Sequence, residues 1–284
     1  MQISPGFLIT ALVASMLLIF TSCETTGEVG VAQEDIDVVI MDAVSDDAFG
    51  DVDDVSFEAM EMTDNSIYAR SFSQAAFRTI SRGCATITND TATKTVTVDF
   101  GTGCLGPDGK TRSGQIVINY SRRLYIPGAT RTVTLVNYVV DSVSIAGSKT
   151  YTNLMVNFRD TLSLNVVLTG GQITMPNGNT ATRAFDRTST WVRGINPSQD
   201  EFWVDGNIQG TRFNGNSFTR TVNSTLVYRR ACRRQQVKIP VEGTATITRS
   251  GQPDIDLDFG MGSCDNLVDV TVNGQTTTVD VTNR

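Results

Sequence analysis

Short β-branched segments alternate with turn residues from residue 83 to the C-terminus, and this alternation limits the chain to a β fold. In residues 95–100, Val96, Val98 and Phe100 occupy every second position, which places them on one face of a strand. We therefore predict an all-β antiparallel domain, built either as a sandwich or as one long twisted sheet. The same pattern predicts further strands at residues 114–120, 132–138, 139–145, 154–158 and 162–168.

The clearest turn lies near the C-terminus, where Asn273-Gly274 separates two runs rich in valine and threonine. This dipeptide is typical of a type I′ turn, because both of its central residues need a positive φ angle. We predict a two-residue hairpin at this position.

An internal repeat adds to the β pattern. Ala85-Thr86-Ile87-Thr88 recurs as Ala245-Thr246-Ile247-Thr248, and an Asp-Phe-Gly triplet and a cysteine follow each copy. The triplets begin at Asp99 and Asp258. The repeat predicts two similar hairpins within the sandwich or sheet.

The N-terminus carries the pattern of an export signal. Residues 7–20 form a largely apolar run, and Thr21, Ser22 and Cys23 follow it. This run suits the core of a signal peptide and is shorter than the ~20 residues that span a bilayer. We predict a lipoprotein signal peptide at residues 1–22 and a lipid on the Cys23 thiol. The alternative is an ordinary signal peptide cleaved nearby, because residues 1–6 contain no basic residue.

The other four cysteines form an even set, as expected for disulfides in an oxidising compartment. Four cysteines allow three pairings. We favour Cys84–Cys104 and Cys232–Cys264, because each pair brackets one local β unit.

Charge divides the chain into two parts. Residues 1–69 contain no lysine or arginine, and all 23 basic residues follow. Residues 23–66 combine many acids with aliphatic side chains, so we predict an acidic tether and leader that is partly ordered against the basic β domain of residues 67–284. We predict a short helix at residues 66–81. The sequence contains no histidine, which excludes histidine-dependent catalysis and most catalytic zinc sites.

Two stretches resemble a known family. Residues 99–114 and residues 258–266, the latter followed by the Val-Asn-Gly hairpin, are similar to β-rich exported lipoproteins of Bacteroidota-type bacteria. The resemblance covers most of residues 84–282. It implies an outer-membrane or cell-surface lipoprotein, and it implies no catalytic residues.

Aromatic and basic residues supply two candidate sites. Trp191 and Trp203 would lie directly opposite each other in a hairpin centred on Pro197. Exposed, the two rings would form a platform for glycan binding, whereas buried they would be an ordinary cross-strand pair. The arginines of residues 229–234 would meet anionic lipids or glycans, dock the acidic leader, or lie exposed at strand ends.

Three carboxylates supply a third candidate site. Asp254, Asp256 and Asp258 alternate, so they share one strand face and would lie roughly 6–7 Å apart. Such a face would bind calcium or supply the acid and nucleophile of a glycosidase. The simpler interpretation is a solvated outer face.

Together these observations predict a lipid-anchored protein of the bacterial outer membrane, exposed at the cell surface. We expect it to serve adhesion, matrix assembly or glycan binding, without catalytic residues, cofactor or nucleic-acid partner. The alternative is a structural lipoprotein that faces the periplasm and binds another envelope protein through its sheet edges or acidic leader. A glycan-active enzyme that uses Asp256 and Asp258 is the third hypothesis.

Overall fold

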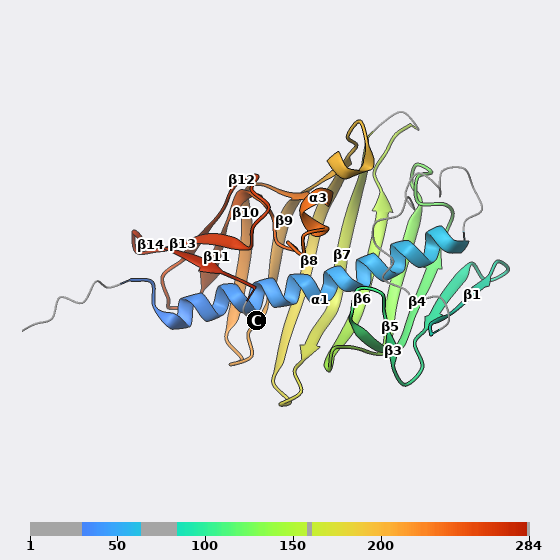
Figure 1. Cartoon of the computed structure of the whole chain (residues 1–284), viewed down its shortest axis with the longest axis horizontal. Coiled ribbons are helices and arrows are strands. Elements are labelled where there is room, and N and C mark those ends of the chain that lie inside the picture. The colour runs from blue at the N-terminus through green and yellow to red at the C-terminus, as the bar shows by residue number, and fades with distance from the viewer. Residues whose placement is uncertain (1–29, 64–83, 158–160, 283–284) are drawn as a thin grey trace, which may run out of the picture.

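The computed structural model describes residues 30–63, 84–157 and 161–282, and in it one long helix crosses one large antiparallel sheet (Figure 1). The helix is α1 (Gln33–Thr63), and the 14-stranded sheet follows chain order from β1 to β14, with β3 paired to β4 beside that path. The first strands are β1 (Thr86–Asp90), β2 (Thr95–Asp99), β3 (Cys104–Leu105), β4 (Thr111–Tyr120), β5 (Thr130–Val140), β6 (Val143–Asn153) and β7 (Leu162–Thr174). The remaining elements are β8 (Thr180–Val192), η1 (Pro197–Gln199), β9 (Glu201–Thr211), β10 (Ser217–Arg229), α3 (Arg230–Arg233), β11 (Glu242–Arg249), β12 (Ile255–Met261), β13 (Leu267–Val272) and β14 (Gln275–Asp280).

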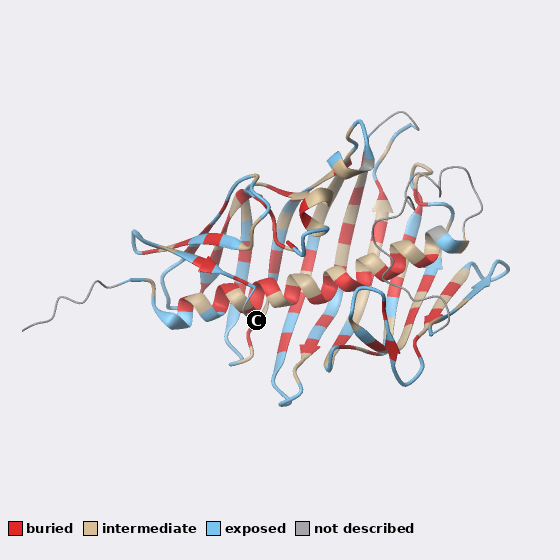
Figure 2. Cartoon of the chain, viewed as in Figure 1, coloured by how far each residue is buried: buried red, intermediate tan, exposed pale blue. Residues whose placement is uncertain are grey.

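The predicted all-β antiparallel class is confirmed, and of its two arrangements the structure has the long sheet. A sandwich is wrong for a physical reason: the inner face of the sheet is covered by α1 rather than by a second sheet (Figure 1). Buried residues alternate with more exposed ones along many of the strands, for example β2, β7 and β12 (Figure 2), which places the buried residues on one face of the sheet. We call the face that carries α1 the inner face and the opposite one the outer face.

Helix α1 buries many of its side chains, although its sequence is strongly acidic. Phe49, Val52, Val55 and Ala59 are buried and join the strand residues in one hydrophobic core. Residues 33–63 of the predicted leader therefore fold as part of the β domain. The predicted signal peptide, Cys23 and the predicted short helix at residues 66–81 lie outside the described residues.

Both hairpins of the predicted repeat are present. Strands β1 and β2 form the first, and β11 and β12 form the second. Asp99 accepts a hydrogen bond from the Gly101 N–H, and Asp258 accepts the same bond from Gly260, each at 2.8 Å. The shared triplet thus forms the same local turn in both places.

The predicted turn and disulfides are confirmed as well. Asn273 and Gly274 have φ angles of 51° and 78° and join β13 to β14 through the pair Val272–Gln275. Cys84 bonds to Cys104, and Cys232 bonds to Cys264.

Candidate functional site

A ladder of ion pairs joins α1 to the sheet and its connections. The acids come from successive turns of α1, and most of the side chains are withdrawn from water, where a charge needs a partner. The pairs are Glu34–Arg212, Asp35–Arg249, Asp42 and Asp46 each with Arg183 and Arg220, Asp47 with Lys110 and Lys238, Asp51 with Lys110 and Arg112, Asp53–Lys149, and Asp54–Arg233.

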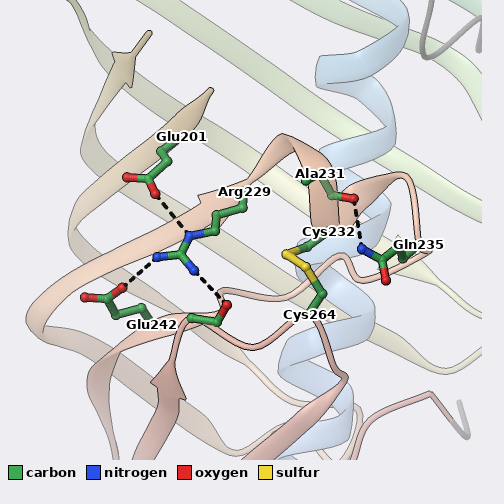
Figure 3. The surroundings of a disulfide bond; sticks show 8 residues. Glu201, Arg229, Ala231, Cys232, Gln235, Glu242 and Cys264 are labelled. Atoms are coloured by element: carbon green, nitrogen blue, oxygen red, sulfur yellow. Dashed lines mark hydrogen bonds and ion pairs between the residues drawn. A yellow bond between two sulfur atoms is a disulfide. The ribbon is translucent and has the colours of Figure 1, made fainter. Parts of the chain in front are cut away.

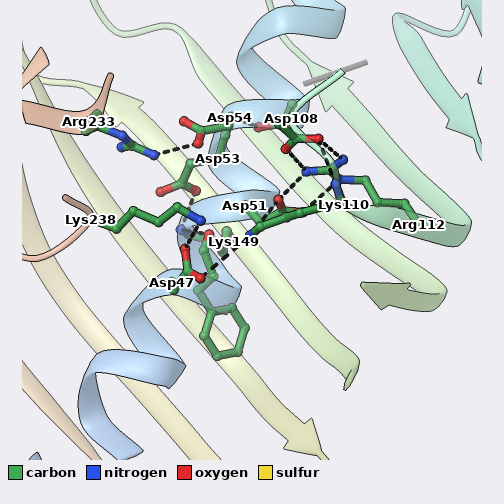
Figure 4. A network of polar contacts seen from close by, with 12 residues as sticks. Asp47, Asp51, Asp53, Asp54, Asp108, Lys110, Arg112, Lys149, Arg233 and Lys238 are labelled. Carbon is green, nitrogen blue, oxygen red and sulfur yellow. Dashed lines mark hydrogen bonds and ion pairs between the residues drawn. The ribbon is translucent and has the colours of Figure 1, made fainter. Parts of the chain in front are cut away.

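Asp51 forms the most densely bonded rung of this ladder (Figure 4). Its carboxylate accepts two hydrogen bonds from the Arg112 guanidinium, at 3.1 and 2.5 Å, and one from the Tyr138 hydroxyl at 2.7 Å. Asp108 holds the other side of the same guanidinium at 3.0 and 2.6 Å. Burial alone would raise the pKa of Asp51, but the bond to Arg112 and the charge of Lys110 outweigh it and lower that pKa.

Asp46, which lies nearer the start of α1, is also bound by two arginines, Arg183 and Arg220. Burial would raise its pKa, but the charges of Arg183 and Arg220 keep the pKa well below its usual value. The neighbouring Lys149 shows the opposite balance. Burial lowers the pKa of Lys149, and its contact with Asp53 offsets only part of that effect.

Two segments contact the helix from opposite ends of the strands (Figure 1). We call residues 104–111 the β3 strap and residues 230–241 the α3 strap. Lys110 of the β3 strap and Lys238 of the α3 strap approach Asp47 from opposite sides, at 3.6 and 3.0 Å (Figure 4). Because Cys104 and Cys232 lie in these straps, each strap is fixed by one disulfide.

These contacts make the ladder structural. Its acids and cations neutralise one another within the fold, and α1 fills the inner face. The outer face of the sheet, by contrast, is not covered by α1 (Figure 1).

The outer face of β9 carries an exposed tryptophan among polar side chains. Trp203 is 41% exposed, and its indole N–H donates to Glu201 at 2.9 Å. Glu201 also accepts from Arg229 at 3.0 Å, and Arg229 contacts Glu242 at 3.3 Å (Figure 3). Asp205, two residues beyond Trp203, is exposed on the same side of the strand. This group combines a flat apolar ring with carboxylates and a guanidinium. We call it the Trp203 cluster (Glu201, Trp203, Asp205, Arg229, Glu242).

The predicted pairing of the two tryptophans is wrong by one residue. Trp191 lies opposite Phe202, and Trp203 lies opposite Thr190. A shift of one residue turns a side chain to the other face of the sheet. Trp191 is accordingly only 6% exposed and stacks on Phe202 with ring centroids 6.4 Å apart. A platform built from both rings is excluded, and Trp203 alone faces solvent.

The three alternating aspartates lie where the simpler interpretation places them. Asp254, Asp256 and Asp258 are all exposed. Asp256 accepts a hydrogen bond from the Thr246 hydroxyl at 2.7 Å, and Asp258 accepts one from the Gly260 N–H. In the residues that the structure describes, no three histidine, cysteine or acidic side chains are grouped so that they could hold a metal ion.

The basic run at residues 229–234 is divided among several partners. Arg229 belongs to the Trp203 cluster, and Arg230 pairs with Asp200 at 3.2 Å. Arg233 binds Asp54 of α1 at 2.5 Å, so this part of the run docks the acidic leader, as one of the three hypotheses predicted.

Sequence reasoning found Trp203 but missed its partners. The alternation Glu201-Trp203-Asp205 was a usable signal, because it places three functional side chains on one strand face. Arg229 and Glu242 come from neighbouring strands, whose register no local pattern reveals.

Neither a protein-family model nor a curated protein nor a solved structure matches this chain. Among the described residues, no helix has the length and apolar character needed to cross a bilayer. The function is therefore inferred from the residues and their geometry.

Proposed function

We propose that this chain is a lipid-anchored cell-envelope protein that binds glycans at the Trp203 cluster and is not an enzyme. The lipid anchor is Cys23, and the site of action is the outer surface of the bacterial outer membrane. The partners are the membrane, through the lipid, and a glycan.

Export is supported by the cysteines. Two disulfides join all four cysteines of the β domain, as expected for a protein that folds in an oxidising compartment. The fifth cysteine, Cys23, follows an apolar run and two small polar residues, the pattern of a lipoprotein signal.

Replacing Cys23 with serine is expected to abolish labelling of the protein by radioactive palmitate and to lower the share found in the membrane fraction, because the acyl chains supply most of the membrane affinity. Thr25→Ser is the matched control and is expected to keep both the label and the membrane association. Equal palmitate labelling of the two variants would contradict the anchor. Protease treatment of intact cells is expected to remove the β domain, and its protection would favour the periplasm-facing alternative.

Trp203 carries the proposal for glycan binding. Its indole is the one tryptophan ring exposed on the described part of the sheet, and it lies beside Glu201 and Asp205. A sugar ring presents an apolar face, which stacks on an indole, and a rim of hydroxyls, which hydrogen-bond to carboxylates and guanidinium groups. The cluster offers both kinds of contact.

Trp203→Ala is expected to weaken glycan binding roughly tenfold or more, because the stacking surface is lost. Val136→Ala, which truncates a side chain that is 41% exposed on β5, away from the cluster, is expected to leave binding unchanged. Binding is measured on a glycan array and then by titration of each glycan that binds. Equal binding by both variants, or no glycan binding by the unaltered protein, would refute the proposal.

The open edges of the sheet favour a second function. Strands β1 and β14 end the path of paired strands, and each pairs with one neighbour among the described residues. A free edge offers unpaired N–H and C=O groups to a strand of another envelope protein. The acidic leader is a weaker candidate for such a partner, because most of its described carboxylates bind cations of the same chain.

A further inference from the structure

Three long connections meet at one end of the sheet. They are residues 121–129 between β4 and β5, residues 154–161 between β6 and β7, and residues 193–200 between β8 and β9. Residues 158–160 of the second connection lie outside the described part of the chain. We call the described residues of these connections the rim.

Hydrogen bonds and strand pairing show that the rim is continuous. The Asn153 amide donates to the Leu124 and Ile126 carbonyls at 2.7 and 3.1 Å, which joins the first connection to the second. Leu162 pairs with Trp191, which places the second connection beside the third. Residues distant in the sequence therefore form one surface.

Aliphatic side chains project from this surface into solvent. Ile195 is 99% exposed, Val156 is 88% exposed and Leu154 is 48% exposed. Single exposed aliphatic residues are ordinary on a protein surface, but three on adjoining connections indicate an interaction site.

The rim is also basic. Arg122, Arg123 and Arg193 are exposed, and Arg193 lies over the Trp191 ring. Within the described rim the one acidic residue is Asp200, which is buried and paired with Arg230. Exposed aliphatic side chains with arginines on the adjoining connections match the two layers of a membrane surface, acyl chains below and anionic headgroups above.

The turns at the opposite ends of these strands lack exposed aliphatic side chains of this size. There β5 joins β6, β7 joins β8 and β9 joins β10 through the short connections 141–142, 175–179 and 212–216, which are rich in asparagine and glycine. None of the large exposed apolar residues of the described chain lies in these three turns. Among the connections of β5 to β10, the exposed large aliphatic side chains therefore lie at the rim end.

We propose that the rim is a membrane-contact surface that inserts Ile195 and Val156 into a bilayer containing anionic lipids. This contact is separate from the Cys23 anchor, since it rests on described residues of the β domain. It orients the strands toward the bilayer at the rim end.

The proposal predicts where a reporter enters the membrane. Ile195→Trp is made in the full chain with Trp191→Phe and Trp203→Phe, so that the added ring is the one tryptophan. Leu105→Trp in the same background is the control, because Leu105 is 64% exposed at the opposite end of the strands. Each variant is bound to phosphatidylcholine vesicles that contain phosphatidylglycerol. The added tryptophan at position 195 is expected to emit at shorter wavelength and to be quenched by brominated lipid, and the one at position 105 is not. Equal quenching of the two would overturn the proposal.

A second experiment measures affinity in the full chain with Cys23→Ser, which lacks the lipid. Adding Val156→Asp and Ile195→Asp is expected to weaken sedimentation with phosphatidylglycerol vesicles roughly tenfold or more, since both aliphatic contacts are lost. Leu105→Asp is expected to have no effect. Equal binding by the two variants would overturn the contact, and equal binding of the parent to vesicles without phosphatidylglycerol would overturn the role of the arginines. Failure of the Cys23 anchor would leave both readouts intact.

Discussion

Asp51→Asn is expected to lower the free energy of unfolding by about 3–5 kcal/mol, among the largest losses from a single change in this protein. The Asp51 carboxylate accepts hydrogen bonds from Arg112 and Tyr138, and the Arg112 side chain is fully buried. An asparagine has nearly the same shape but no charge. The change would therefore leave part of a buried guanidinium charge uncompensated, while Asp108 would still hold its other side.

The measurement is a urea unfolding curve, monitored by circular dichroism. Asp37→Asn is the matched control, because Asp37 lies on the same helix, is exposed, and accepts a hydrogen bond from the exposed Gln33. The control is expected to change stability by less than about 0.5 kcal/mol. Equal midpoints for the two variants would show that the ladder does not stabilise α1.

The position of α1 explains why sequence reasoning predicted only a partly ordered leader. A helix at a protein surface usually has one apolar stripe, because its apolar residues recur with a period of about 3.6. Helix α1 lacks such a stripe, because its own buried residues, apolar and acidic, are spread around the helix. Valine, aspartate and glycine are poor helix formers, and like charges such as Asp42 and Asp46 stand four residues apart. The cations that favour this helix lie at residues 110–249. A pattern within residues 33–63 cannot reveal these distant cations.

Turns show the same limit on a smaller scale. The Asn273-Gly274 hairpin was predictable, because its residue types suit positive φ angles. Asp141 and Ser142 have φ angles of 47° and 70° and join β5 to β6, where residues 139–145 were predicted as one strand. An Asp-Ser pair predicts positive φ angles much less clearly than Asn-Gly does.

The tryptophan register shows how a loop can reverse a functional prediction. The connection between β8 and β9 holds the short helix η1, and its closing strand pair is Val192–Glu201. A hairpin centred on Pro197 would have paired Trp191 with Trp203. The strand positions were thus predictable from alternation, whereas the face of each ring depended on the loop.

Removing the Cys232–Cys264 disulfide is expected to destabilise the protein by about 4 kcal/mol, because the bond closes a long loop in the unfolded chain. The two cysteines are 32 residues apart, and Cys232 is buried. The bond also fixes the α3 strap, which supplies Arg233 to Asp54 and Lys238 to Asp47 (Figure 4). We therefore expect Cys232→Ala with Cys264→Ala to loosen α1 as well.

Cys84→Ala with Cys104→Ala separates these two effects. That disulfide spans 20 residues, so chain entropy alone predicts a loss of about 3 kcal/mol, close to that of the first pair. Its removal leaves the α3 strap in place. Hydrogen exchange at the α1 amides near Asp54 is expected to accelerate more in the Cys232 and Cys264 variant than the difference in global stability explains. Exchange that follows global stability in both variants would mean that the disulfide acts on the unfolded chain alone and that the strap does not hold the helix.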